Sequence, residues 1–253
     1  MELPSSGVSE PVRTSTELRV IGTAKSHDVL LRVLTDKQPC KILDVPAGEG
    51  VFCAFLRDRA WDVHAADIDP GNFRLSDVPF TQVNLNRRLP FDDASFDAVS
   101  CVNGLHRLIA PTVAVSEFYR ILRPEGRLYI NINNYSSIWK RLRFLATGSI
   151  DEAIESQFCI QTIDDPEANV RIPLLYPRLH AMLLIAGFAV VDVRPAAVST
   201  RDRMLAPIAW AVAALGRVLP SAVRSKLSID QANALAIVGG GAYAFIEAVK
   251  SSR

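Results

Sequence analysis

The sequence is poor in cysteine. Only four of its 253 residues are cysteines, and no pair among them has the spacing of metal ligands or suggests a disulfide framework (Cys40, Cys53, Cys101 and Cys159). We therefore expect no metal site. We also expect these thiols to be reduced, in a cytoplasmic protein.

The chain also lacks a net charge of either sign. Its 28 basic and 27 acidic side chains leave a formal charge of +1, so no overall field would attract a nucleic acid. Residues 1–15 are polar and lack the apolar core of a signal peptide. We therefore expect no nucleic-acid partner, and we expect a flexible N-terminal arm.

A long apolar run that could span a membrane is missing too. The strongly apolar stretch Met204–Gly216 is shorter than the ~20 residues that a bilayer span needs. Its apolar residues lie all around the helix that they predict, which favours burial of that helix. Three other roles stay open for residues 203–220: a cap on an acceptor pocket, a homodimer face, or contact with a membrane surface.

Strands and helices alternate along most of the chain. Apolar runs predict strands that are separated by segments with helical periodicity. This alternation implies an α/β fold whose mostly parallel sheet carries helices on both faces. Expected strands are 41–45, 63–68, 81–85, 96–102, 127–133, 189–194 and 242–249; expected helices are 16–35, 51–61, 112–122, 136–147 and 174–188, with a turn at 124–126.

The stretch KILDVPAGEG (41–50) resembles a nucleotide-binding turn without matching the dinucleotide fingerprint. That fingerprint needs glycines at its first, third and sixth positions, and counting from Gly48 the sixth position is Cys53. A nicotinamide or flavin cofactor is therefore disfavoured. Asp67 ends the next strand, where a carboxylate can accept two hydrogen bonds from ribose hydroxyls.

Four segments in order resemble the class I S-adenosylmethionine-dependent methyltransferases. They are ILDVPAGEG (42–50), AADIDP (65–70), LPFDDASFDAVSCVNGLHRL (89–108) and EFYRILRPEGRLYI (117–130). The resemblance implies a Rossmann-like, doubly wound fold with a seven-stranded sheet, formed as a single domain over residues 16–253. It implies S-adenosyl-L-methionine as cofactor and methyl transfer as activity. Segments 148–170 and 200–235 would be a lid or acceptor elements.

The resemblance assigns cofactor contacts residue by residue. Asp44, Gly48 and Gly50 would line the methionine and ribose, and Asp67 would hold the ribose hydroxyls beside Ile68 at the adenine. Asn84 and Leu85 would lie at the adenine edge, and the stretch from Cys101 through Val102 to Asn103 would flank the sulfonium. Two positions depart from the family: Pro46 replaces a glycine and stiffens the cofactor turn, and Asn84 replaces an aspartate.

The acceptor chemistry is less defined. His106 can exchange a proton near neutral pH and Asn103 can hydrogen bond, so both are candidate catalytic residues; the alternative for His106 is a histidine on the helix surface or with a structural role. Asn133, Asn134 and Tyr135 would contact an acceptor or make a turn. The segments NNYSSIWKRLRFLATG (133–148) and RIPLLYPRLHAMLLIAGF (171–188) also resemble a bacterial subgroup of these enzymes. This further resemblance implies O- or N-methylation of a small molecule or saccharide. The alternative is a non-catalytic binding or regulatory protein with the methyltransferase fold, which Pro46, Asn84 and Asn103 motivate.

Overall fold

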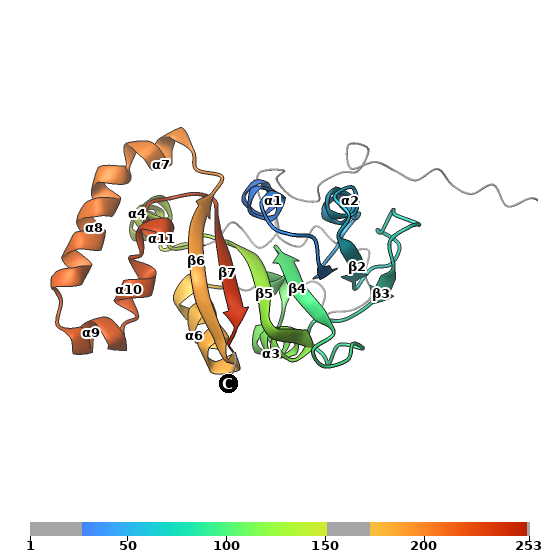
Figure 1. Cartoon of the computed structure of the whole chain (residues 1–253). Helices are drawn as coiled ribbons and strands as arrows, with labels where there is room; N and C mark the ends of the chain where they lie inside the picture. Colours follow the sequence, from blue (N-terminus) through green and yellow to red (C-terminus); the bar gives the residue numbers. More distant parts are fainter. Residues whose placement is uncertain (1–26, 151–172, 252–253) are drawn as a thin grey trace, which may run out of the picture.

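Seven strands of the described residues form one sheet in the order β3-β2-β1-β4-β5-β7-β6 (Figure 1). The structure is a computed structural model, and it describes residues 27–150 and 173–251. The strands are β1 (Lys41–Asp44), β2 (Asp62–Asp67), β3 (Phe80–Gln82), β4 (Phe96–Val102), β5 (Leu122–Asn133), β6 (Phe188–Ala196) and β7 (Tyr243–Lys250).

Most of the sheet is parallel. Strands β1 to β5 pair in parallel, whereas β7 runs antiparallel to both of its neighbours, β5 and β6. This arrangement confirms the expected mostly parallel, seven-stranded, Rossmann-like sheet. Because the parallel strands all end at one edge, the turns that follow β1, β2 and β4 lie together there, at the top of Figure 1.

Helices cover both faces of the sheet, because alternate strand residues point to opposite sides. Ile42 packs with helices α1 and α2, and its neighbour Leu43 packs with α3 and α6. The helices are α1 (Asp28–Thr35), α2 (Val51–Arg57), the 3-10 turn η2 (Leu105–Arg107), α3 (Pro111–Ile121), α4 (Ile138–Thr147), α6 (Tyr176–Ala186), α7 (Thr200–Met204), α8 (Ala206–Val218), α9 (Ser221–Lys226), α10 (Ile229–Ala232) and α11 (Leu235–Val238).

Two local expectations differ from the structure. The turn expected at 124–126 lies inside β5 as a bulge: β5 pairs with β4 at Leu122 and next at Arg127, and Glu125 between them has a φ of 62°. The strand expected at 81–85 ends at Gln82. Asn84 ends it early, because its side-chain oxygen accepts the Asn86 N–H at 2.9 Å and closes a turn.

The expectation that the apolar helix is buried was wrong. The helices α7 to α11 form an arm between β6 and β7 (residues 197–242). Helix α8 lies at the outer end of this arm, and it packs on α10 and α11 rather than on the sheet (Figure 1). It buries only its small residues, whereas Trp210 is 62% exposed and Leu215 69%. Within the described ranges no helix is both long and apolar enough to cross a bilayer.

Two expected segments lie largely outside the described residues. The N-terminal arm 1–15 and the first part of the helix 16–35 fall before residue 27, and α1 begins at Asp28. The lid expected at 148–170 falls mostly within 151–172.

Candidate functional site

The turn after β1 is held against two neighbouring strands. The Val45 N–H donates to the Ser100 carbonyl, and the Ala47 N–H donates to the Ala66 carbonyl, both at 2.9 Å. The Val45–Pro46 peptide bond is cis. These two bonds place the turn across the carboxyl ends of β2 and β4.

The end of this turn requires glycine. Gly48 and Gly50 have φ angles of 55° and 92°, and Gly50 is the N-cap of α2. A Cβ on Gly50 would also lie 2.8 Å from the Phe73 ring. The two glycines bring the backbone N–H groups at the start of α2 to the edge of the sheet, where they can approach an anionic or polar ligand closely.

Asp67 joins the ends of β1 and β2. Its carboxylate accepts the Gly48 N–H at 2.8 Å and the Asp69 N–H at 3.2 Å, and the residue is 8% exposed. A carboxylate has about four lone-pair sites, so room for further donors remains. The geometry therefore fits the predicted contact with ribose hydroxyls. Ile68 follows directly and is half-buried, with its carbonyl accepting from Gln82.

Asp44 is held below the turn. It is 2% exposed, and it accepts the Ser100 hydroxyl at 2.7 Å and the Cys53 thiol at 3.3 Å. Burial raises the pKa of its carboxyl to about 7, with a smaller contribution from the charge of Asp67. The predicted contact of Asp44 with the cofactor would therefore be a third hydrogen bond, at a lone-pair site that the two internal donors leave.

The end of β4 presents backbone rather than side chains at the predicted sulfonium position. Cys101 and Val102 are both buried and pack on opposite faces of the sheet. Burial raises the pKa of the Cys101 thiol to about 12, so this thiol is neutral. Gly104 lies against the cofactor turn, since a Cβ there would be 2.5 Å from Pro46 Cδ and 2.8 Å from Cys101 Sγ.

Asn103 is the residue at this edge that most resembles a ligand contact. It has a φ of 55°, and its N–H donates to the Asn131 carbonyl at 3.0 Å. Its side-chain Oδ1 is buried and has no hydrogen-bond partner in the described part of the chain. A strained backbone and an unmet acceptor together are typical of functional positions. His106 follows in η2 and is 6% exposed, so it is a buried side chain and not a surface one.

The predicted adenine edge is occupied internally. Asn84 Oδ1 already accepts from Asn86, and Leu85 is 7% exposed within the core against α3. An adenine amino group would therefore share Asn84 Oδ1 with the Asn86 N–H, at the second lone pair of that oxygen. Asn134 is engaged internally: its Oδ1 accepts the Ser136 N–H at 3.1 Å in a turn, and its Nδ2 donates to the carbonyls of Ile237 and Gly240 near α11.

Two residues that shape the site escaped the sequence analysis. Ser100 holds Asp44, and its signal was a polar residue in an otherwise apolar strand. Gly104 permits the close approach to Pro46, and its signal was a glycine directly after the strand end. Within residues 27–150 and 173–251, no group of three or more His, Cys, Asp or Glu side chains could hold a metal ion.

Comparison with known proteins identifies methyltransferases as similar to this chain. A family model described as "Methyltransferase domain" matches residues 43–130. A demethylmenaquinone methyltransferase of Clavibacter sepedonicus is 36% identical over 47% of this chain and 51% of its own, so the chain spans about half the length of that relative. The ubiquinone/menaquinone biosynthesis C-methyltransferase UbiE of Chromobacterium violaceum is 31% identical over 60% of this chain and 68% of its own.

A solved structure shares the fold. The 1,6-didemethyltoxoflavin-N1-methyltransferase of Burkholderia thailandensis, with 1,6-didemethyltoxoflavin and S-adenosylhomocysteine bound, superimposes with a TM-score of 0.51 at 16% identity. The match covers 90% of this chain and 78% of that one. Together with the strand order and the turn beside Asp67, these matches show that the chain belongs to the class I S-adenosylmethionine-dependent methyltransferase family.

Proposed function

We propose that this chain transfers a methyl group from S-adenosyl-L-methionine to a small-molecule acceptor, at an oxygen or a nitrogen. A saccharide is one such acceptor. The cofactor supplies the reactive methyl group when it is bound, and the chain supplies binding, orientation and a site with little water. The observation that carries the proposal is the bond between Gly48 and Asp67 at the same sheet edge as Asn103.

Different residues at this edge would bind the cofactor, position the acceptor and remove its proton. Asp67 would hold the ribose hydroxyls, while Gly48 and Gly50 keep the backbone close to the ligand. Asn103 Oδ1 would accept a hydrogen bond from the acceptor, which requires an acceptor that carries an O–H or N–H group. An amide cannot take a proton at neutral pH, so Asn103 is a positioning residue. His106 would take the proton of a hydroxyl acceptor on a ring nitrogen.

Binding of S-adenosylhomocysteine tests the first step. We expect calorimetry to detect binding, and Asp67→Ala to weaken it by about tenfold or more, because the ribose hydroxyls lose a charged partner. Asp69→Ala is the matched control: Asp69 caps its own turn by accepting from Gly71 and Asn72. Absence of binding to the wild-type chain, or equal losses in both variants, would contradict the proposed cofactor site.

An acceptor panel tests the second step. Release of S-adenosylhomocysteine is followed by mass spectrometry with sugar nucleotides, small phenols and amines, and a demethylated quinone. The quinone is included because of the names of the two relatives. A 13C-labelled methyl group then identifies the methylated atom by NMR. Product from hydroxyl or amine acceptors supports the proposal, whereas methylation only at a quinone carbon would refute the O- or N-acceptor assignment.

A further inference from the structure

The outer face of α8 is an exposed apolar surface. Its side chains are 45% to 84% exposed, and no charged residue interrupts the helix between Arg203 and Arg217. We call this surface the α8 outer face; it consists of Ile208, Trp210, Leu215 and Val218 of α8, together with Met204 at the end of α7. Scattered apolar residues are common on protein surfaces, but a contiguous set on one helix indicates an interaction site.

Small residues on the inner side of α8 allow this helix to pack closely against the rest of the arm. Ala209, Ala213 and Gly216 follow one another at helical spacing and are buried. A Cβ on Gly216 would lie 2.6 Å from Asn233 Nδ2, so the helix packs closely through a narrow stripe. The arm is tied to the domain by Arg141, whose guanidinium donates to the Asn233 side chain at 2.6 Å and to the Ala232 carbonyl. The large apolar residues are therefore held outward on a fixed support.

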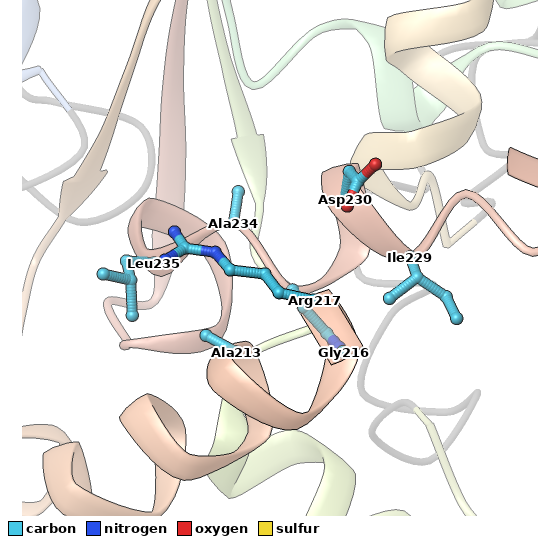
Figure 2. A pocket seen from close by; sticks show the side chains of 8 residues that line it. Ala213, Gly216, Arg217, Ile229, Asp230, Ala234 and Leu235 are labelled. Atoms are coloured by element: carbon cyan, nitrogen blue, oxygen red, sulfur yellow. The ribbon is translucent and has the colours of Figure 1, made fainter. Parts of the chain in front are cut away.

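On the inner side of α8, a hollow of about 320 Å³ lies between this helix and α10–α11 (Figure 2). Arg217 extends along it toward Ala234 and Leu235, and Asp230 lies at its other end. Its lining comes from the arm and not from the candidate cofactor residues.

The charge of the arm is strongly positive. Residues 197–242 contain five basic and two acidic residues, hence +3 in a chain of net +1, and α4, which packs against α8 through Ile138, adds three more basic residues. The two acidic residues are engaged: Asp202 is 4% exposed within a capping box, and Asp230 pairs with Arg224 at 3.2 Å. The basic residues are Lys140, Arg141, Arg143, Arg201, Arg203, Arg217, Arg224 and Lys226.

We infer that the α8 outer face binds an anionic phospholipid surface, with the helix lying in the plane of the interface. Apolar side chains with cations at the helix ends are the combination that such a surface attracts. Helix α8 has 13 residues, about 20 Å at 1.5 Å per residue, which suits an interfacial position and not a span. A second copy of the chain is disfavoured as the occupant, because the two positively charged arms would repel each other.

The arm leaves the sheet at the same edge as the candidate site. β6 ends at Ala196, which pairs with Tyr243 of β7, and Tyr243 pairs with Asn133 at the end of β5. Helix α7 then begins at Thr200 and leads into α8 (Figure 1). The inference does not rest on the proposed methyl transfer, because vesicle binding needs no turnover.

Vesicle flotation tests the inference on the full chain. Wild-type protein should float with phosphatidylcholine vesicles that contain phosphatidylglycerol, and should bind about tenfold or more weakly to phosphatidylcholine alone or at high salt. The triple variant Trp210→Ser, Leu215→Ser, Val218→Ser should lose about tenfold or more in binding. The matched control Leu184→Ser, Ile185→Ser, Val191→Ser removes equally exposed apolar residues on α6 and β6 and should bind as wild type.

A charge variant separates the two contributions. Arg203→Gln, Arg217→Gln and Lys226→Gln together should reduce anionic-vesicle binding by about a hundredfold, since each cation contributes about fivefold. Circular dichroism melting checks that every variant is folded. The inference is overturned by absence of vesicle binding, by equal binding to neutral vesicles, or by equal losses in the serine variant and its control. It is also overturned if sedimentation shows a wild-type dimer that the serine variant dissociates.

Discussion

Replacing Asp44 with asparagine should change how stability depends on pH. The carboxyl is 2% exposed, and it accepts one hydrogen bond from Ser100 and one from Cys53. Burial raises its pKa from the ordinary 3.8 to about 7. When protonated, Asp44 can donate to Ser100 Oγ, whose own hydrogen can then turn to the Leu43 carbonyl at 3.4 Å. The neutral carboxyl therefore fits the site without an unmet partner.

The sign of the effect follows from proton binding. Between about pH 4 and pH 7 the folded chain holds this proton and the unfolded chain does not, so the free energy of unfolding falls as pH rises. The shift of about three units corresponds to roughly 4 kcal/mol over the whole window, at about 1.4 kcal/mol per unit. About two of these units lie between pH 5 and pH 7, so raising the pH from about 5 to about 8 should cost the wild type about 3 kcal/mol from this group.

Asp44→Asn removes this ionisation and keeps an oxygen that accepts from Ser100. Urea unfolding, followed by tryptophan fluorescence, should show that the variant gains about 3 kcal/mol relative to the wild type between about pH 5 and about pH 8. Ser100→Ala deletes a hydrogen-bond donor that lowers the pKa of Asp44. In this variant the decrease in the free energy of unfolding should therefore occur at a higher pH than in the wild type. A difference between wild type and Asp44→Asn that is the same at both pH values would refute the reasoning.

Two further substitutions test the edge of the sheet. Gly104→Ala places a methyl group 2.5 Å from Pro46 Cδ and should destabilise the chain by about 1–3 kcal/mol in urea unfolding, whereas Gly71→Ala, whose Cβ meets only the Asp69 carboxylate oxygen at 3.1 Å, should cost less than about 1 kcal/mol. His106→Gln should lower turnover by about a hundredfold or more on a hydroxyl acceptor while calorimetry shows unchanged S-adenosylhomocysteine affinity; wild-type turnover would exclude His106 as the base.

The strands and helices that pack on the sheet could be predicted because their residues alternate between two environments. β4 spans Phe96–Val102 as expected, with nearly every residue buried. Helix α6 ends before Gly187, whose φ of 106° suits the glycine that the sequence places there. Where a periodic pattern meets a residue with a defined backbone role, the element is determined locally.

Helix α8 was misjudged for a physical reason. Its inner face consists of small residues such as Ala209 and Gly216, and its outer face carries the large ones such as Leu215, so both faces are apolar in the sequence. A hydrophobic pattern shows which side chains avoid water, but it cannot show which side has a partner within the same chain. The family resemblance predicted the seven-stranded sheet correctly, but it did not predict which face of α8 is exposed.

The cofactor residues could be predicted by type but not by their internal partners. Asp44 is occupied by Ser100 and Cys53, Asn84 by its own turn, and Asp67 in part by Gly48. Asn103 Oδ1 has no such partner among the described residues. A buried acceptor without a donor costs about 1–3 kcal/mol, and a bound molecule that donates to it recovers that free energy. The acceptor end of the site therefore gains most from its ligand, and a substrate with a hydroxyl or amino group should bind more tightly than an analogue without one.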